Sequence, residues 1–115
     1  MPKRTRSGHL VVLVTCGSRG EAHMIARRVV TLHLAACVNV LESPLKSVYR
    51  WKGKVRHARE FLLMIKTSRG RLAALRAEVQ RLHSYDVPEF IALPIVAGSP
   101  AYLRWIDDCL RPTAS

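Results

Sequence analysis

The feature that most constrains this chain is a pair of long strand-like runs joined by two residues. The runs, at 46–51 and 54–66, are rich in valine, isoleucine and aromatic residues, and Lys52-Gly53 lies between them. A glycine at the second position of a two-residue loop between such runs predicts a β-hairpin. A shorter apolar strand is expected just before it, at 36–41. We therefore expect the sheet to form around this hairpin.

The rest of the sequence alternates between strand and helix patterns. Ser18 and Glu21 have the spacing of a capping box, and apolar residues recur behind them at helical intervals. In chain order, we expect a strand at 10–14, a helix from Ser18, the three strands above, a second helix capped by Thr67 or Ser68, a strand at 89–96 and a closing helix from Ser99. This order predicts an α+β fold, the ferredoxin-like β-α-β-β-α-β sandwich with an antiparallel sheet, an extended hairpin and a C-terminal helix.

Three stretches of the expected strands lack the polar alternation that a half-exposed sheet needs. Residues 10–14, 61–65 and 90–93 are apolar at every position, although an antiparallel sheet with helices on one face has its other face open to water. Two main helices and a short one cannot cover both faces. We expect further copies of the chain to cover the open face; the alternative is that the C-terminal helix and the loops suffice.

Length and composition place the chain among single-domain globular proteins. It has 115 residues, 49% of them hydrophobic, so we expect one domain at 9–111 between a flexible basic tail at 1–8 and a short tail at 112–115. The longest apolar runs fall short of the ~20 residues that span a bilayer, so no membrane helix is expected. The N-terminus lacks the pattern of a secretory signal. Three cysteines without a CxxC pair indicate a reducing compartment, and we expect the protein to be cytoplasmic.

The formal net charge of +11 is the one extreme value in the composition. Such a charge attracts nucleic acids, anionic membranes and acidic ligands through non-specific electrostatics. The basic residues, however, are spread over both main helices, the hairpin and both ends of the chain. This spread favours a role in solubility and keeps nucleic-acid binding as a minor alternative.

Thiol and imidazole groups are the candidate ligands in this sequence. Cys16 follows a strand, Cys37 lies within one and His83 begins a loop, and this ligand set suits copper or zinc. Their long spacing matches no local metal motif, so two alternatives stay open: a buried cysteine packs as a small hydrophobe, and a histidine at a helix end bonds a carbonyl. Cys16 with His83 is also the one pair that suits a nucleophile and its base. No catalytic constellation stands out, and we expect a non-enzymatic protein.

Aromatic and basic side chains alternate along the first hairpin strand. Tyr49 and Trp51 lie on one face of it, and Arg50 and Lys52 lie on the other. Residues arranged in this way can stack nucleic-acid bases. They can equally pack between subunits, where aromatic residues are enriched, and the apolar sheet favours this second interpretation.

Seven short blocks of sequence follow one another between Leu10 and Leu110. They are VTC at 14–16 with Ser18 and Glu21, LAACVN at 34–39, SVYRWKGK at 47–54, IKT at 65–67, HSYDVPE at 83–89, IALP at 91–94 and YLRW at 102–105. With these blocks the chain resembles the CutA family, also called divalent-cation tolerance proteins. The resemblance implies a ferredoxin-like subunit that assembles as a homotrimer, with hairpin strands paired across subunits. It also implies a link to copper tolerance and divalent-metal binding, with no settled enzymatic reaction.

The resemblance extends to individual site residues. Cys37 and His83 match positions implicated in metal binding, and Glu89 matches an acidic position nearby. The cysteine that some members carry at the end of the first strand falls two residues before Cys16. Many members have acidic residues after the hairpin turn, where this chain has VRHAR at 55–59. We therefore expect this arm to attract cations more weakly and an anionic partner more strongly.

The leading hypothesis is a non-enzymatic trimer that binds a metal ion or a small ligand at clefts between subunits and acts in metal homeostasis or signalling. Its metal ligands are expected among Cys16, Cys37, His83 and Glu89, and its ligand cleft is expected to contain Tyr49, Arg50, Trp51, Lys66 and Tyr85. The alternative is a trimeric signalling protein, similar to the nitrogen-regulatory signal proteins, that senses an anionic metabolite among Arg50, Lys66 and other basic residues.

Overall fold

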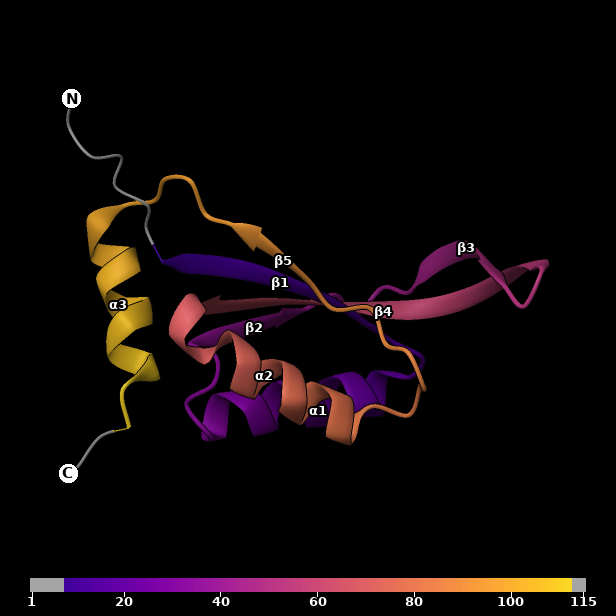
Figure 1. The fold of residues 1–115 in the computed structure, drawn as a ribbon, viewed down its shortest axis with the longest axis horizontal. Coiled ribbons are helices and arrows are strands. Elements are labelled where there is room, and N and C mark those ends of the chain that lie inside the picture. The colour runs from indigo at the N-terminus through magenta and orange to yellow at the C-terminus, as the bar shows by residue number, and fades with distance from the viewer. Residues whose placement is uncertain (1–7, 113–115) are drawn as a thin grey trace.

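The structure, a computed structural model, describes residues 8–112 and contains one antiparallel sheet and three helices (Figure 1). The elements in chain order are β1 (His9–Cys16), α1 (Arg19–Thr31), β2 (Cys37–Val40), β3 (Leu45–Trp51), β4 (Lys54–Ser68), α2 (Arg69–Leu82), β5 (Ile91–Pro94) and α3 (Pro100–Leu110). The mixed α+β fold predicted from the sequence is confirmed. Of the tails expected at 1–8 and 112–115, all but Gly8 and Pro112 lie outside the described residues.

The long strand β4 organises the sheet. Its second half pairs with β1 and β2, which gives the strand order β2-β4-β1-β5, and its first half pairs with β3. The β3-β4 hairpin extends beyond the layer of helices (Figure 1). At its tip Lys52 and Gly53 have φ angles of 51° and 77°, which are the two positive φ values of a type I′ turn. The expected hairpin and the position of its turn are therefore confirmed.

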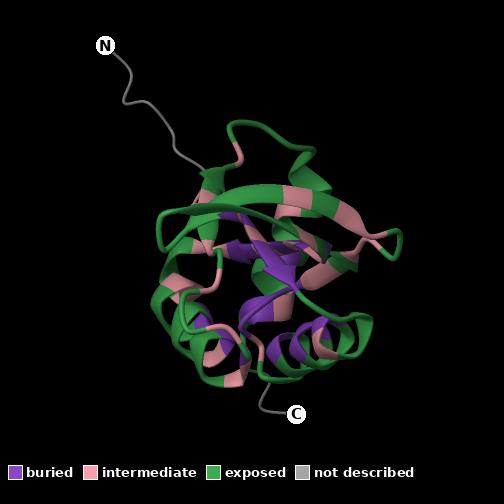
Figure 2. Ribbon diagram, turned by 90° about the vertical axis from the view of Figure 1, so that its right-hand side faces the viewer, coloured by how far each residue is buried: buried purple, intermediate pink, exposed green. Residues whose placement is uncertain are grey.

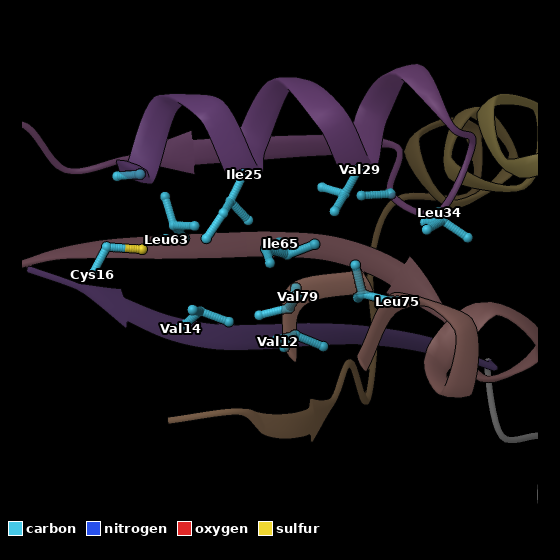
Figure 3. Packing of buried hydrophobic residues seen from close by; sticks show 12 residues of the cluster. Val12, Val14, Cys16, Ile25, Val29, Leu34, Leu63, Ile65, Leu75 and Val79 are labelled. Atoms are coloured by element: carbon cyan, nitrogen blue, oxygen red, sulfur yellow. The ribbon is translucent and has the colours of Figure 1, made fainter. Parts of the chain in front are cut away.

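Helices α1 and α2 cover one face of the sheet and enclose the core (Figures 1 and 2). Alternate residues of β1 and β4 point toward these helices, because successive side chains of a strand face opposite sides. Figure 3 shows the resulting row of packed side chains, with Cys16 at one end of it. The buried members include Val12, Val14, Cys16, Ile25, Val29, Leu63, Ile65, Leu75 and Val79. This core fixes the positions of α1, α2 and the strands, whose ends surround the site described below.

The two main helices begin in different ways. At α1, the Ser18 hydroxyl accepts a hydrogen bond from the backbone N–H of Glu21 at 3.1 Å, as a capping serine does. At α2, Ser68 occupies the N-cap position, but its side chain makes no capping hydrogen bond. The neighbouring Thr67 is fully buried, and its hydroxyl donates to the carbonyl oxygen of Leu34 at 2.8 Å. Thr67 therefore fastens β4 to the chain before β2 and does not cap the helix.

Strand β5 is shorter than the stretch 89–96 that the sequence suggested. It lies at the edge of the sheet and pairs with β1 alone, with Pro94 opposite Leu10. A proline cannot donate a ladder hydrogen bond, so an edge is where it is tolerated. Pro94 lies on such an edge strand, because the sheet ends with β5.

The sheet face away from α1 and α2 is apolar and partly exposed in the single chain. Ile91 and Leu93 of β5 are 47% and 45% exposed. Helix α3 packs at the end of the sheet opposite the hairpin (Figure 1). Its Ile106 and Leu110 are buried together with Ala36. Within residues 8–112, α3 leaves Ile91 and Leu93 accessible, so the prediction that other copies cover this face stays open.

None of the three helices in the described part of the chain has the length and hydrophobicity that a membrane crossing requires.

Candidate functional site

A hollow of about 410 Å³ lies where the base of the hairpin meets the loop between α2 and β5. We call it the Tyr85 cleft. Its lining comes from four places: the end of β1, strand β3, the middle of β4 and the loop before β5. The lining residues are Thr15, Tyr49, Trp51, Glu60, Tyr85, Asp86, Val87 and Glu89. The cleft thus depends on the long hairpin and on the loop that follows α2.

Tyr85 and Glu60 form the central contact of the cleft. The phenol of Tyr85 donates a hydrogen bond to Oε2 of Glu60 at 2.9 Å, and Glu60 is only 8% exposed. Burial, followed by the hydrogen bond to the Glu60 carboxylate and its charge, raises the pKa of Tyr85 above its usual value. Tyr85 therefore stays a neutral hydrogen-bond donor at physiological pH.

Negative charge gathers in the cleft although the chain as a whole is strongly basic. Glu60, Asp86 and Glu89 are three of its eight acidic residues, and none of the lining residues in the described part of the chain is basic. Burial raises the pKa of Glu89, and the charge of Glu60 raises it further, while a hydrogen bond from Thr15 opposes the shift. Two neighbouring carboxylates raise each other's pKa in this way, because the negative charge of one disfavours the charged form of the other. The electrostatics of the cleft therefore favour a cation.

A thiol, a carboxylate and an imidazole converge beside the cleft, on the helix side of the sheet. One ligand atom each from Cys16, Glu21 and His83 lies within 4.8 Å of the others. We call these three residues the Cys16 cluster. Because thiolate, carboxylate and imidazole are all metal ligands, the cluster is a candidate site for copper or zinc.

Hydrogen bonds fix the orientation of His83, whose side chain is fully buried. Nε2 donates to the carbonyl oxygen of Thr15 at 2.8 Å, and Nδ1 accepts from the backbone N–H of Tyr85 at 3.1 Å. A carbonyl oxygen only accepts, so these partners assign the proton to Nε2. The Glu21 carboxylate lies 3.2 Å from Nδ1 and accepts from the backbone N–H of Ser84. The loop that begins at His83 is thereby held against β1 and α1.

The thiol of Cys16 is buried in the core and stays protonated. Burial, followed by the negative charges of Glu21 and Glu60, raises the pKa of this thiol to about 12. A nucleophilic cysteine needs the opposite, a pKa lowered toward neutrality by a positive neighbour. Cys16 and His83 do come together, but as a thiol beside an imidazole whose two nitrogens both have partners. Their geometry does not favour nucleophilic catalysis.

The structure places Cys37 away from the Cys16 cluster. Cys37 pairs with Lys66 on β4, whereas Cys16 pairs with Phe61, five residues earlier. An odd spacing along a strand means opposite faces, and five residues correspond to about 17 Å. The Cys37 sulfur lies 3.8 Å from the hydroxyl of Tyr102 and 3.9 Å from Nζ of Lys66. Cys37 therefore does not complete a site with Cys16 and His83 within one chain.

The structure brings together some of the other expected site residues. Tyr49, Trp51, Tyr85 and Glu89 all line the Tyr85 cleft. The remaining two expected cleft residues lie outside this lining. Arg50 lies between Tyr49 and Trp51 and so faces the other side of β3, and Lys66 reaches toward Asn39 on β2.

The chain is similar in sequence to proteins of a known family. The sequence matches the family model described as CutA1 divalent ion tolerance protein over residues 10–109. The chain belongs to the CutA1 divalent ion tolerance family. The resemblance found from the sequence blocks is thereby confirmed.

The relatives of this CutA1 family member differ in length. The divalent-cation tolerance protein CutA of Archaeoglobus fulgidus is 41% identical over 103 residues, which are 90% of this chain and 99% of that protein. The CutA homolog of Xenopus laevis is 47% identical over 95 residues, 83% of this chain. The chain spans only 62% of the Xenopus protein and 56% of the chloroplastic CutA of Arabidopsis thaliana.

Solved structures of CutA proteins have the same fold. The structure of the periplasmic divalent cation tolerance protein CutA from Archaeoglobus fulgidus is similar with a TM-score of 0.86 at 40% identity, covering 90% of this chain and 99% of that chain. The divalent cation tolerance protein from Thermus thermophilus is similar with a TM-score of 0.83 at 44% identity, covering 85% and 94%. The antiparallel sheet with its helices is thus the fold of the family.

Two acidic residues of this CutA1 family member belong to the site although the sequence did not single them out as ligands. The spacing of Ser18 and Glu21 predicts a capping box, but the Glu21 carboxylate reaches Ser84 and His83 in place of the α1 terminus. The sequence pattern of Glu60 predicts only that it belongs to the second hairpin strand. The available signal was its isolation, because it is the single acidic residue between 43 and 77.

Proposed function

We propose that this protein is a non-enzymatic homotrimer of the cytoplasm that binds a divalent metal ion at the Cys16 cluster or a small ligand at the adjoining Tyr85 cleft. Its role would be in metal tolerance or homeostasis, with copper as the metal of first choice. The observation that carries the proposal is the convergence of Cys16, Glu21 and His83 beside a cleft with three carboxylates. Membership of the family supports a role in divalent-cation tolerance.

The donor set of the Cys16 cluster fits a borderline or soft divalent ion. Sulfur and imidazole nitrogen suit copper and zinc, and a carboxylate can complete the set. A bound ion would have to displace the proton of the Cys16 thiol, whose pKa is raised to about 12. It would also replace the Tyr85 backbone N–H at Nδ1 of His83. Binding would therefore release a proton, and the affinity should rise with pH.

Titration calorimetry with Cu(I), Cu(II) and Zn(II) tests the metal proposal. We expect Cys16→Ala and His83→Gln to weaken binding at least about tenfold, since each removes one ligand. Cys37→Ala is the matched control, because Cys37 lies on the other face of the sheet, and it should leave the affinity unchanged. Absence of binding to the parent protein, or equal losses in the Cys16 and Cys37 variants, would refute the metal proposal.

The proposal of a homotrimer is supported by the apolar sheet face. Ile91 and Leu93 are nearly half exposed in the single chain, and contiguous exposed apolar surface of this kind marks interaction sites. Sedimentation or native mass measurement should give three times the chain mass of 12.9 kDa. Leu93→Glu should cause dissociation, whereas Val30→Glu, on the outer face of α1, should not. A parent protein that is monomeric at micromolar concentration would contradict the proposal.

The proposal that the protein is not an enzyme is supported by the state of its best nucleophile candidate. Cys16 is held as a thiol by burial and by two carboxylates. His83 is engaged through both ring nitrogens, so it cannot accept the thiol proton without losing a contact. This arrangement suits ligand binding better than covalent catalysis.

A further inference from the structure

Within residues 8–112, the lining of the Tyr85 cleft combines aromatic rings with carboxylates and contains no basic side chain. Tyr49 and Trp51 are 43% and 39% exposed in the single chain. Glu60, Asp86 and Glu89 supply the negative charge. Lysine and arginine are missing from this described lining, although the chain has 19 of them against eight acidic residues. The cleft is therefore a local acidic and aromatic surface on a basic protein.

A metal ion does not account for this combination. Metals are bound by ligand atoms that converge on one point. Among residues 8–112, the set of three such ligands that converges within 4.8 Å is the Cys16 cluster, and none of its members lines the cleft. The cleft carboxylates instead flank a hollow of about 410 Å³, which is within the range that holds small organic molecules.

Aromatic faces and carboxylates together recognise organic cations. An ammonium or guanidinium group is attracted to the face of tryptophan or tyrosine by the quadrupole of the ring, and carboxylates add charge-assisted hydrogen bonds. The carboxylates of the cleft also repel one another, since burial and the charge of Glu60 raise the pKa of Glu89. A positive group between these carboxylates would reduce their repulsion. An anionic metabolite would increase it.

We infer that the Tyr85 cleft binds a small organic cation that carries an ammonium or guanidinium group. The carboxylates of Glu60 and Glu89 would contact the positively charged group of the ligand. The rings of Tyr49 and Trp51 would pack against the ligand's carbon atoms. This inference rests on the proposed function in one respect, since it names the ligand class of the same cleft. It does not depend on metal binding at the Cys16 cluster.

Titration calorimetry on the full-length protein tests the inference with three probes. Choline supplies a quaternary ammonium, and agmatine supplies a primary ammonium and a guanidinium. The third probe is the neutral isostere of choline, in which a tert-butyl group replaces the trimethylammonium group. We expect at least one cation to bind, and we expect the neutral isostere to bind roughly tenfold more weakly than choline if choline is that cation. Failure of both cations to bind would overturn the inference, and so would binding of choline that is no tighter than that of its isostere.

Matched variants locate the binding. Glu89→Gln removes one charge but keeps an acceptor for Thr15, and Trp51→Leu removes a ring; each should weaken cation binding roughly tenfold. The controls are Glu42→Gln and Trp105→Leu, which change similarly exposed residues outside the cleft lining and should bind as the parent does. Cation binding that survives both cleft substitutions would refute the inference.

The same variants separate this inference from the metal proposal. Glu89→Gln and Trp51→Leu should leave copper and zinc binding unchanged, while Cys16→Ala should leave cation binding unchanged. If the parent binds the cations but no metal, the metal proposal fails and the inference holds. If it binds metal but neither cation, the inference fails and the metal proposal holds.

Discussion

The phenol of Tyr85 donates a hydrogen bond to the buried carboxylate of Glu60 at 2.9 Å. This contact joins the loop after α2 to the middle of β4, across 25 residues of sequence. The backbone N–H of Tyr85 meanwhile donates to Nδ1 of His83, and the two rings lie 4.7 Å apart. One residue therefore connects the Tyr85 cleft with the Cys16 cluster, and the stability of the site should depend on it.

Tyr85→Phe should lower the free energy of unfolding by about 1–3 kcal/mol. The substitution keeps the ring but leaves the nearly buried Glu60 carboxylate without its donor, and an unsatisfied buried polar group costs about this much. Chemical denaturation at one fixed protomer concentration measures the effect. Tyr49→Phe is the control, because Tyr49 is 43% exposed and its substitution should change little. Equal effects of the two substitutions would contradict the central role of the Tyr85 contact.

Two glycine substitutions also test the hydrogen bond between Tyr85 and Glu60. A Cβ at Gly17 would lie 3.0 Å from the hydroxyl oxygen of Tyr85, whereas a Cβ at Gly20 would meet nothing within 4 Å. Gly17→Ala should therefore displace the Tyr85 hydroxyl from Glu60 and destabilise the protein by about 1–3 kcal/mol. Gly20→Ala, near the start of α1, should stabilise it by about 0.5 kcal/mol. Thermal or chemical unfolding distinguishes the two, and a stabilising Gly17→Ala would show that the phenol can move freely.

The pKa of Cys16 predicts how stability depends on pH. Its folded value of about 12 lies above the ordinary 9.0, so between these values the folded chain holds a proton that the unfolded chain has lost. Stability from this group is thus fully present below pH 9 and is lost as the pH rises toward 12. Compared with the parent, Cys16→Ala should lose stability less steeply in this range, by up to about 1.4 kcal/mol per pH unit.

Denaturation at a series of pH values measures this difference. Below pH 8 the curves of the parent and of Cys16→Ala should run parallel, since the thiol is protonated in both the folded and the unfolded parent chain. The comparison between the two proteins removes the contributions of other groups that titrate in alkali, such as Tyr85. Parallel curves throughout would mean that the Cys16 thiol is not held protonated by the fold.

Local sequence patterns were sufficient to predict the fold. The hairpin depended on Lys52-Gly53 between two strand-like runs, and the start of α1 depended on Ser18; both signals involve residues within a few positions of each other. The Thr67 hydroxyl was harder to place, since its partner Leu34 lies 33 residues away. Two neighbouring candidates for a cap could not be separated without that distant contact.

The candidate site was only partly predictable because its contacts are long-range. The capping-box pattern gave a sufficient local explanation for Glu21, yet its carboxylate bonds Ser84, 63 residues later. The burial of Glu60 depends on how the loop containing Tyr85 packs against β4. Cys37 carried the correct chemistry, but only the strand register shows that it faces away from Cys16. Residue type suggested the ligands, and topology decided which of them meet.

The turn of the hairpin offers a test in which stability should increase. Lys52 has a φ of 51°, a left-handed conformation that costs residues with a Cβ about 1–2 kcal/mol. Asparagine tolerates this conformation, and Asn-Gly is the preferred pair for a type I′ turn. Lys52→Asn should therefore raise the free energy of unfolding by about 0.5–1 kcal/mol, measured by chemical denaturation at a fixed protomer concentration.

Two further substitutions show whether backbone conformation is the cause. Gly53→Ala places a Cβ on a residue with a φ of 77° and should destabilise the turn by about 1 kcal/mol. His33 also has a positive φ, of 60°, but its Nδ1 donates to the carbonyl oxygen of Cys109 at 3.0 Å. His33→Asn should consequently give little net gain, because the lost hydrogen bond offsets the relief of strain. If Lys52→Asn gave no increase while Gly53→Ala was tolerated, the turn would not be under the conformational constraint that its φ angles indicate.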